Sequence, residues 1–211
     1  MTEKFEFYFN GDLVSPDKFG PVYISDFIRI LEIYATTGIR NILEWGSGLT
    51  TQVLAARLER MPNIELFVTI DTNRAYQNAI FAGRPKPACL REMILDPIGP
   101  HDQQAVSETT YSTYPLRLGR KFDFIFIDGR RRMECAFVAS VVSHPETIVV
   151  IHDYRRARYQ TILALFDVIE DGEEFRVLRP RREVLTAMQE GVARMEAALG
   201  PENRAWDATK N

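Results

Sequence analysis

Cysteine is scarce in this chain, and its two thiols stand alone. Cys89 and Cys135 are the only cysteines among 211 residues, and neither belongs to a Cys-x-x-Cys pair. A disulfide framework needs more cysteines, and a structural zinc site needs closely spaced ligands. We therefore expect two reduced, partly buried thiols that behave as small apolar side chains.

Long apolar runs and a strong charge of one sign are also lacking. The N-terminal segment MTEKFEFYFNGD alternates charged and aromatic residues, which is not typical of a signal peptide. No stretch reaches the roughly 18 apolar residues that a membrane span needs. The formal net charge of −3 does not favour a nucleic-acid partner. We expect a cytoplasmic protein without a nucleic-acid or membrane partner, and leave open whether it forms a homo-oligomer.

Short apolar segments alternate with helical patterns over most of the chain. Each segment ends at or just before an acidic residue or a His-Asp pair, and the segments are Asn41–Glu44, Leu66–Ile70, Met93–Leu95, Phe122–Ile127 and Thr147–Ile151. Strands that alternate with helices predict a mostly parallel sheet that is covered on both faces. The spacing of apolar residues predicts helices at Asp26–Ala35 (with Ser25 as N-cap), Thr50–Met61, Arg132–Ser143 and Tyr159–Glu170.

The C-terminal part of the chain has a different pattern. Two strand-like runs, Phe175–Leu178 and Glu183–Thr186, are joined by a tight connection and predict an antiparallel hairpin. A helix from about Ala187 to Leu199 should follow. The predicted fold is a three-layer α/β/α sandwich with a mostly parallel seven-stranded sheet. Residues 1–200 would form one Rossmann-like domain, with 1–38 as a lead-in and helix, and 201–211 as a polar tail.

The segment ILEWGSGLTT (42–51) predicts a nucleotide-cofactor loop between the first strand of the sheet and the next helix. Glycine lets the chain turn sharply and lets a ligand approach the backbone. Asp71 ends the following strand, 23 residues after Gly48, which is close to the roughly 20 residues expected of a ribose-binding acid. The alternative is a tight strand–helix turn that binds nothing.

This loop departs from the Gly-x-Gly-x-x-Gly pattern of dinucleotide-binding proteins. Thr51 stands where the third glycine would be, and Glu44 lies two residues before the first glycine. A carboxylate at this place would repel a pyrophosphate. It would attract S-adenosylmethionine, which carries a sulfonium and an ammonium group but no phosphate.

With these features the sequence resembles the class I S-adenosylmethionine-dependent methyltransferases, which have a seven-stranded Rossmann-like fold. The resemblance rests on LEWGSGLTT (43–51), TIDTN (69–73), FDFIFIDGRRR (122–132) and TIVVIHDY (147–154), which occur in the order of the family. It implies that Asp71 binds the ribose hydroxyls and that Asp96 lies near the adenine. The full set of implied cofactor-binding residues is Glu44, Gly46, Ser47, Gly48, Thr50, Thr51, Asp71, Thr72, Asp96 and Asp128.

Two arginine clusters follow the fourth and fifth strands of the predicted sheet, at residues 130–132 and 155–158. A helix N-terminus disfavours cations, so arginines at two such places call for a reason. We expect Arg130, Arg131 and Arg155 to bind an anionic acceptor, and a solvated surface is the alternative.

Methyl transfer to a hydroxyl also needs a base, for which Asp128, His152 and Asp153 are the candidates. Catechol-type methyltransferases hold Mg²⁺ with acids that follow the same two strands, and Asp128 and Asp153 match those positions. However, Tyr154 stands here in place of the amide ligand of that group, so we assign no metal ligands and leave open whether a divalent metal is used.

The sequence thus predicts methyl transfer to a small, anionic or sugar-like acceptor at oxygen. One alternative is an NAD-dependent oxidoreductase or epimerase. Glu44 and the missing third glycine argue against it. The Tyr-x-x-x-Lys pair is also lacking, because Arg158 stands at the lysine position after Tyr154. Another is a methyltransferase-like module without catalytic activity. The segment Gly99–Gly119, with Tyr111 and Tyr114, would either cover the site or form a surface excursion.

Overall fold

The computed structural model describes residues 7–9, 12–14, 21–34, 38–58, 63–81, 86–95, 110–191, 193, 194 and 197. Residues 182–191 are helical as well. The named elements, in chain order, are β1 (Phe7–Phe9), β2 (Asp12–Val14), α1 (Pro21–Tyr34), β3 (Asn41–Trp45), α2 (Leu49–Leu58), β4 (Leu66–Asp71), α3 (Arg74–Ile80), β5 (Leu90–Ile94), η2 (Tyr114–Leu118), β6 (Phe122–Ile127), α5 (Arg132–Val141), β7 (Ser143–His152), η3 (Ala157–Ala164), β8 (Phe166–Asp171) and β9 (Phe175–Pro180).

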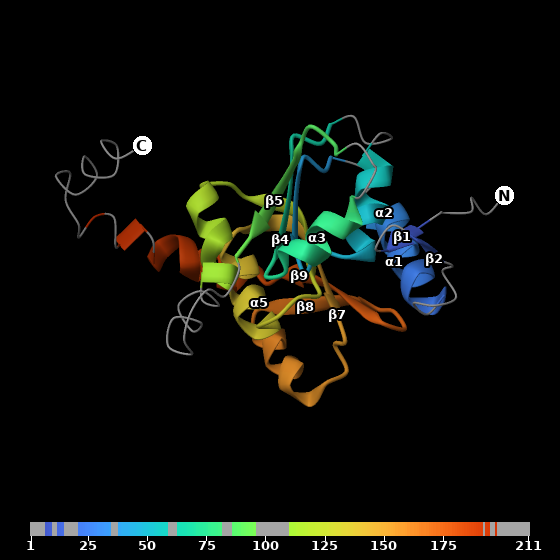
Figure 1. Ribbon diagram of the computed structural model, residues 1–211. Coiled ribbons are helices and arrows are strands. Elements are labelled where there is room, and N and C mark those ends of the chain that lie inside the picture. Colours follow the sequence, from blue (N-terminus) through green and yellow to red (C-terminus); the bar gives the residue numbers. More distant parts are fainter. Residues whose placement is uncertain are drawn as a thin grey trace, which may run out of the picture.

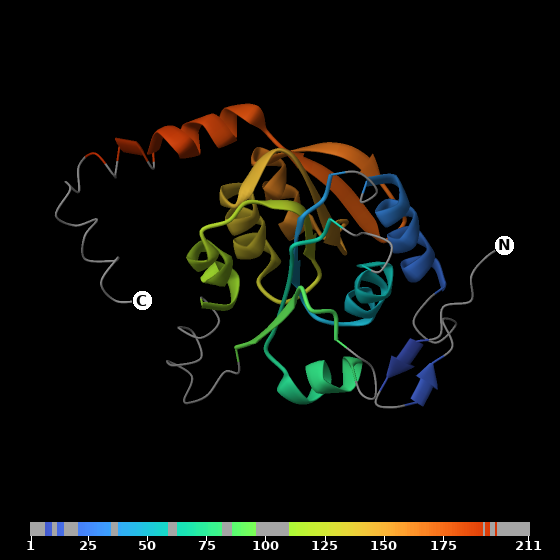
Figure 2. The same cartoon turned by 90° about the horizontal axis from the view of Figure 1, so that it is seen from above.

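Seven strands form one sheet in the order β5-β4-β3-β6-β7-β9-β8, with helices on both sides (Figures 1 and 2). Strands β5, β4, β3, β6 and β7 pair in parallel, and β9 runs antiparallel to both of its neighbours. Strands β1 and β2 form a separate antiparallel hairpin. The predicted sandwich, with its mostly parallel seven-stranded sheet and C-terminal antiparallel hairpin, is confirmed.

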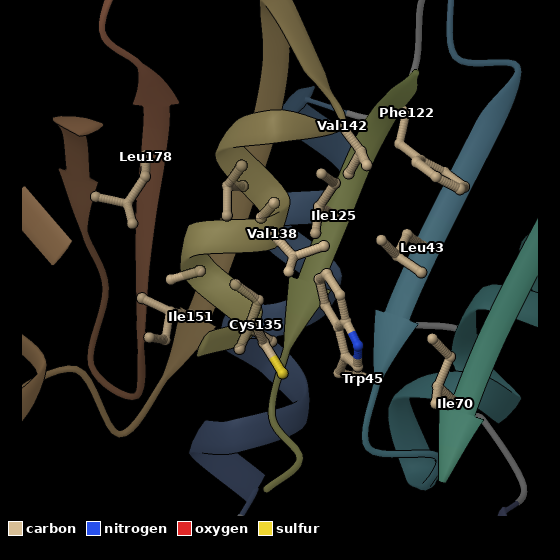
Figure 3. Packing of buried hydrophobic residues seen from close by; sticks show 14 of the residues in the cluster. Leu43, Trp45, Ile70, Phe122, Ile125, Cys135, Val138, Val142, Ile151 and Leu178 are labelled. Atoms are coloured by element: carbon tan, nitrogen blue, oxygen red, sulfur yellow. The ribbon is translucent and has the colours of Figure 1, made fainter. Parts of the chain in front are cut away.

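Each face of the sheet has its own apolar core, because successive side chains of a strand point to opposite faces. Ile42 and Phe126 pack with α1 and α2 on one face. Leu43, Trp45 and Ile125 pack with α5 on the other face, as Figure 3 shows. The central strands are therefore buried on both faces, which explains their nearly continuous apolar sequences.

The C-terminal hairpin lies one strand earlier in the chain than predicted. The helix expected over Tyr159–Glu170 is wrong, because η3 is a 3₁₀ helix over Ala157–Ala164 and strand β8 follows it. Asp171-Gly172 at the end of β8 is a typical hairpin turn signal. The second predicted strand, Glu183–Thr186, is helical and belongs to residues 182–191.

Other element boundaries differ by a few residues. Helix α1 begins at Pro21, so Ser25 lies inside the helix and is not its N-cap; proline suits the first turn because its missing N–H has no helical partner there. Cys89 and Cys135 are free thiols, as predicted. Among the described helices, none has the length and apolar content required to cross a membrane. The predicted tail, 201–211, lies outside the described residues.

Candidate functional site

The carboxyl ends of the four parallel strands β4, β3, β6 and β7 bring the predicted site together. The glycine loop follows β3, Asp71 ends β4, Asp128 follows β6 and His152 ends β7. Ligands of open parallel sheets bind beyond this edge of the sheet. Of the predicted residues, only Asp96 lies outside the described part of the chain.

The N–H groups of the glycine loop are used within the protein. Gly46 N donates to the backbone oxygen of Ile70 (2.9 Å), Ser47 N donates to Oδ2 of Asp71 (3.0 Å), and Gly48 N donates to Oγ1 of Thr51 (2.7 Å). A phosphate-binding loop directs such groups at its ligand instead. These three donors are therefore not arranged to hold a pyrophosphate.

Two glycines let the chain segments after β3 and β6 come into close contact. Gly46 has a φ of 95°, and a Cβ on it would lie 2.5 Å from the backbone nitrogen of Gly129. A Cβ on Gly129 would overlap the hydroxyl of Tyr111. Tyr111 is buried, and its backbone oxygen accepts a hydrogen bond from Nε1 of Trp45 (3.0 Å). Tyr111 and Ser112 therefore belong to the core beside the site, whereas Leu116 and Arg117 are exposed. Residues 99–109 lie outside the described part.

Glu44 lies fully buried beneath the glycine loop. Its Oε1 accepts a hydrogen bond from Thr50 (2.7 Å), and its Oε2 accepts hydrogen bonds from Thr51 (2.6 Å) and Thr69 (2.7 Å). Burial raises the pKa of Glu44 to about 7, although the three hydroxyl donors oppose that rise. The carboxylate joins β3 to the first turn of α2 and to β4. That Glu44, Thr50 and Thr51 contact a cofactor directly stays a prediction.

Asp71 is tied to the same loop from the other side. Besides Ser47 N, the backbone N–H groups of Thr72 (2.6 Å) and Asn73 (2.8 Å) donate to its carboxylate. Burial raises the pKa of the Asp71 carboxyl, and the three N–H donors and the positive charge of Arg130 oppose this rise. Asp71 is half-buried and lies at the edge where a ribose would bind.

His152 lies between two carboxylates. Its Nδ1 is 2.6 Å from Oδ1 of Asp128, and its Nε2 is 3.5 Å from Oε2 of Glu174. The imidazole packs against Phe175 with ring centroids 5.1 Å apart. Burial lowers the pKa of His152, but the hydrogen bond and charge of Asp128 and the charge of Asp153 outweigh it and raise the pKa. An Asp–His pair of this kind can accept a proton at Nε2.

Arg132 is the cation at the centre of this edge. Its guanidinium contacts the carboxylates of Asp128 (2.9 Å) and Asp153 (3.1 Å), and it donates to the backbone oxygens of residues 128, 129 and 152. The space between the two acids therefore holds a positive charge already, which does not suit a divalent ion. Within the described ranges, no cluster of three or more histidine, cysteine, aspartate or glutamate side chains is placed to hold a metal ion.

The three arginines expected to bind the acceptor have different surroundings. Arg131 pairs with Glu134 of α5 (2.8 Å). Arg155 is exposed and stacks over the ring of Tyr154, 5.6 Å from its centroid. Arg130 is exposed at the Asp71 side of the edge. Acceptor binding by these arginines stays a prediction, and the arginine that does most for the geometry is Arg132.

Comparisons with known proteins agree with this architecture. No family model matches the sequence, and no curated protein matches it significantly. A methyltransferase-like protein of Silicibacter pomeroyi DSS-3 has a similar structure, with 19% identity, a TM-score of 0.57, and coverage of 77% of this chain and 91% of that one. The N-methyltransferase NodS of Bradyrhizobium japonicum WM9 is similar at 14% identity and a TM-score of 0.51, over 77% of this chain and 98% of its own.

The structure of the MycE methyltransferase in complex with Mg, S-adenosylhomocysteine and mycinamycin VI is also similar. It has 11% identity and a TM-score of 0.52, over 79% of this chain and 48% of its own. Together with the strand order, these likenesses show that the chain has the fold of the class I S-adenosylmethionine-dependent methyltransferases.

Proposed function

We propose that this chain transfers a methyl group from S-adenosylmethionine to an oxygen of a small acceptor. The glycine loop carries the proposal, because its three N–H groups are bonded within the protein and carboxylates lie beneath and beside it. Asp71 and Asp128 place carboxylates at this edge, and Glu44 lies buried beneath the loop with its pKa raised to about 7. Such a site suits a cofactor with cationic groups and repels a pyrophosphate.

In this proposal the residues around the cofactor have two kinds of role. Gly46, Ser47, Gly48 and Thr72 line it, and Asp71 accepts the ribose hydroxyls. Glu44, with its threonine partners, acts from below by fixing the loop. When bound, the cofactor would supply an electrophilic methyl group.

His152 is proposed as the base that takes the proton of the acceptor hydroxyl. With Nδ1–H donating to Asp128, the lone pair at Nε2 faces away from that acid. As the acceptor oxygen bonds to the methyl carbon, the carbon–sulfur bond breaks and the hydroxyl proton passes to Nε2. The products are a methyl ether and S-adenosylhomocysteine. Asp153, which accepts a hydrogen bond from Arg132, positions that arginine instead of moving a proton.

The chemistry of the acceptor follows from the charges near His152. The exposed guanidinium groups of Arg130 and Arg155 support an acceptor that carries a carboxylate, a phosphate or several hydroxyl groups. A small anionic or sugar-like molecule meets this requirement.

Calorimetry with S-adenosylmethionine, S-adenosylhomocysteine and NAD tests the cofactor. We expect the two adenosyl sulfur compounds to bind and NAD not to bind; the reverse would favour an oxidoreductase. Formation of S-adenosylhomocysteine with a panel of hydroxylated anionic acceptors then tests the reaction. Binding without turnover across the panel would favour a methyltransferase-like module that lacks catalytic activity.

A further inference from the structure

The turn between β8 and β9 carries Glu174, a residue that the sequence did not single out. Oε2 of its carboxylate lies 3.5 Å from Nε2 of His152. This distance exceeds the 2.7–3.2 Å of an ordinary hydrogen bond with a nitrogen donor. The Glu174 side chain is also 44% exposed, against 21% for Asp128. The imidazole is thus held tightly at Nδ1 and loosely at Nε2.

Contacts of the backbone fix the position of Glu174. Its N–H donates to Oδ2 of Asp26, a buried acid of α1, at 3.1 Å. Its backbone oxygen accepts a hydrogen bond from the N–H of Asp153, also at 3.1 Å. A Cβ on Gly172 would overlap the Asp26 carboxylate, so glycine is required for this close approach. The turn is therefore fastened to α1 and to the segment after β7, which keeps the Glu174 side chain at His152.

The charged groups around His152 come from every element that packs against it. Asp128 follows β6, Arg132 belongs to α5, Asp153 is the next residue, and Glu174 comes from the hairpin turn. Three of these four charges are negative. They favour the protonated imidazole, whereas a general base must be neutral when the acceptor arrives.

We propose that Glu174 is a positioning residue that occupies Nε2 of His152 before the acceptor binds and yields this nitrogen to the acceptor hydroxyl. The inference rests on the proposed role of His152 as the base. The hydroxyl replaces Glu174 at Nε2, so the imidazole loses one of the three carboxylates that favour its protonated form. The acceptor must therefore present a neutral hydroxyl at this point and direct any anionic group toward the arginines.

The test compares Glu174→Gln with Glu173→Gln, which removes the same charge from an exposed neighbour in the same turn. The pKa of His152 is measured by NMR in the wild type and in both variants. We expect Glu174→Gln to lower it by about half a unit to one unit and Glu173→Gln to leave it nearly unchanged. The low-pH limb of the kcat/KM profile should move to lower pH with it, and the acceptor KM should fall because a competitor for Nε2 has gone.

The two readouts separate this inference from the proposed function. An unchanged pKa of His152 in Glu174→Gln, or an equal shift in both variants, would overturn the inference even if methyl transfer occurs. If the pKa of His152 shifts only in Glu174→Gln but the protein transfers no methyl group, the contact between Glu174 and His152 is supported and the proposed function is wrong. Circular dichroism confirms that both variants are folded.

Discussion

Two histidine–aspartate pairs join the neighbouring strands β6 and β7, one pair at their amino ends and one at their carboxyl ends. At the amino end, Nε2 of His144 is 2.8 Å from Asp123, and at the carboxyl end, Nδ1 of His152 is 2.6 Å from Asp128. The contacts are alike, but the surroundings differ. Asp123 also accepts hydrogen bonds from the backbone N–H groups of Arg40 (2.8 Å) and of residue 41 (2.7 Å), and these bonds connect the start of β3 to β6.

The pair at the carboxyl end is surrounded by charged side chains instead. Asp128 contacts Arg132, and His152 has Glu174 at its second nitrogen. A histidine–aspartate contact is therefore no evidence of catalysis by itself. Its place at the ligand-binding edge of a parallel sheet, with charged neighbours, sets one pair apart from the other.

The largest effect should come from replacing the two histidines in turn. His152→Ala should lower kcat by roughly 10²- to 10⁴-fold, the usual contribution of a general base. His144→Ala should leave kcat within about twofold of the wild type and affect only the free energy of unfolding. Steady-state kinetics of both variants check this. Equal losses of kcat in His152→Ala and His144→Ala would show that the pair at the carboxyl end has no special role in catalysis.

The next effect concerns Glu44, the buried support of the carboxyl end. Glu44→Ala leaves a cavity and three threonine hydroxyls without their acceptor, so the free energy of unfolding should fall by about 3 kcal/mol or more. Chemical unfolding measures it. The control is Glu65→Ala, an exposed acid paired with Arg40 (3.4 Å), which should change stability by at most about 1 kcal/mol. Equal stability of the two variants would show that Glu44 does not brace the loop.

Stability should also depend on pH through Glu44. Its pKa is about 7 in the folded protein, above the ordinary 4.5, so the folded state binds the proton more tightly. The stabilisation is complete below pH 4.5 and is lost as the pH rises through 7, by up to about 3 kcal/mol. Unfolding at pH 5 and pH 8 should show a larger loss in the wild type than in Glu44→Gln, where the raised pKa of His152 still contributes to the pH dependence. The same pH dependence in both proteins would contradict it.

The smallest effect should come from the arginines at the rim. Arg131→Ala with Arg155→Ala should weaken binding of an anionic acceptor about tenfold, which corresponds to about 1.4 kcal/mol. The affinity for S-adenosylhomocysteine should not change, because the proposal assigns both arginines to the acceptor and not to the cofactor. Acceptor KM and cofactor Kd are the two measurements. Equal loss of both, or of neither, would mean that the arginines do not bind the acceptor.

The sequence predicted the central strands well because their residues are buried on both faces. Strand β6 has the predicted bounds, Phe122–Ile127. Strand β8 was missed because it is one of the two edge strands of the sheet, where Val168 and Ile169 are exposed and no alternation of buried and exposed residues marks it. The Asp171-Gly172 turn was the signal that could have located it.

The site was predictable where it depends on the ends of strands and not where it depends on tertiary packing. Asp71, Asp128 and His152 follow from the parallel sheet. Glu174 depends on a hairpin that the sequence analysis misplaced and on a contact with α1. The burial of Glu44 was unexpected because unpaired acids are rarely buried fully. The only features of the sequence that pointed to this burial were the threonines that donate hydrogen bonds to Glu44 in the folded protein, Thr50, Thr51 and Thr69.

The most direct test of the account is a calorimetric titration of S-adenosylhomocysteine into three proteins: the wild type, Asp71→Ala and His152→Ala. The account predicts that the wild type binds it, that Asp71→Ala weakens binding at least tenfold, and that His152→Ala binds as the wild type does. The account places the cofactor at the carboxyl ends of β3 and β4 and the acceptor at those of β6 and β7. It would be contradicted if the wild type did not bind S-adenosylhomocysteine, or if His152→Ala lost as much affinity as Asp71→Ala.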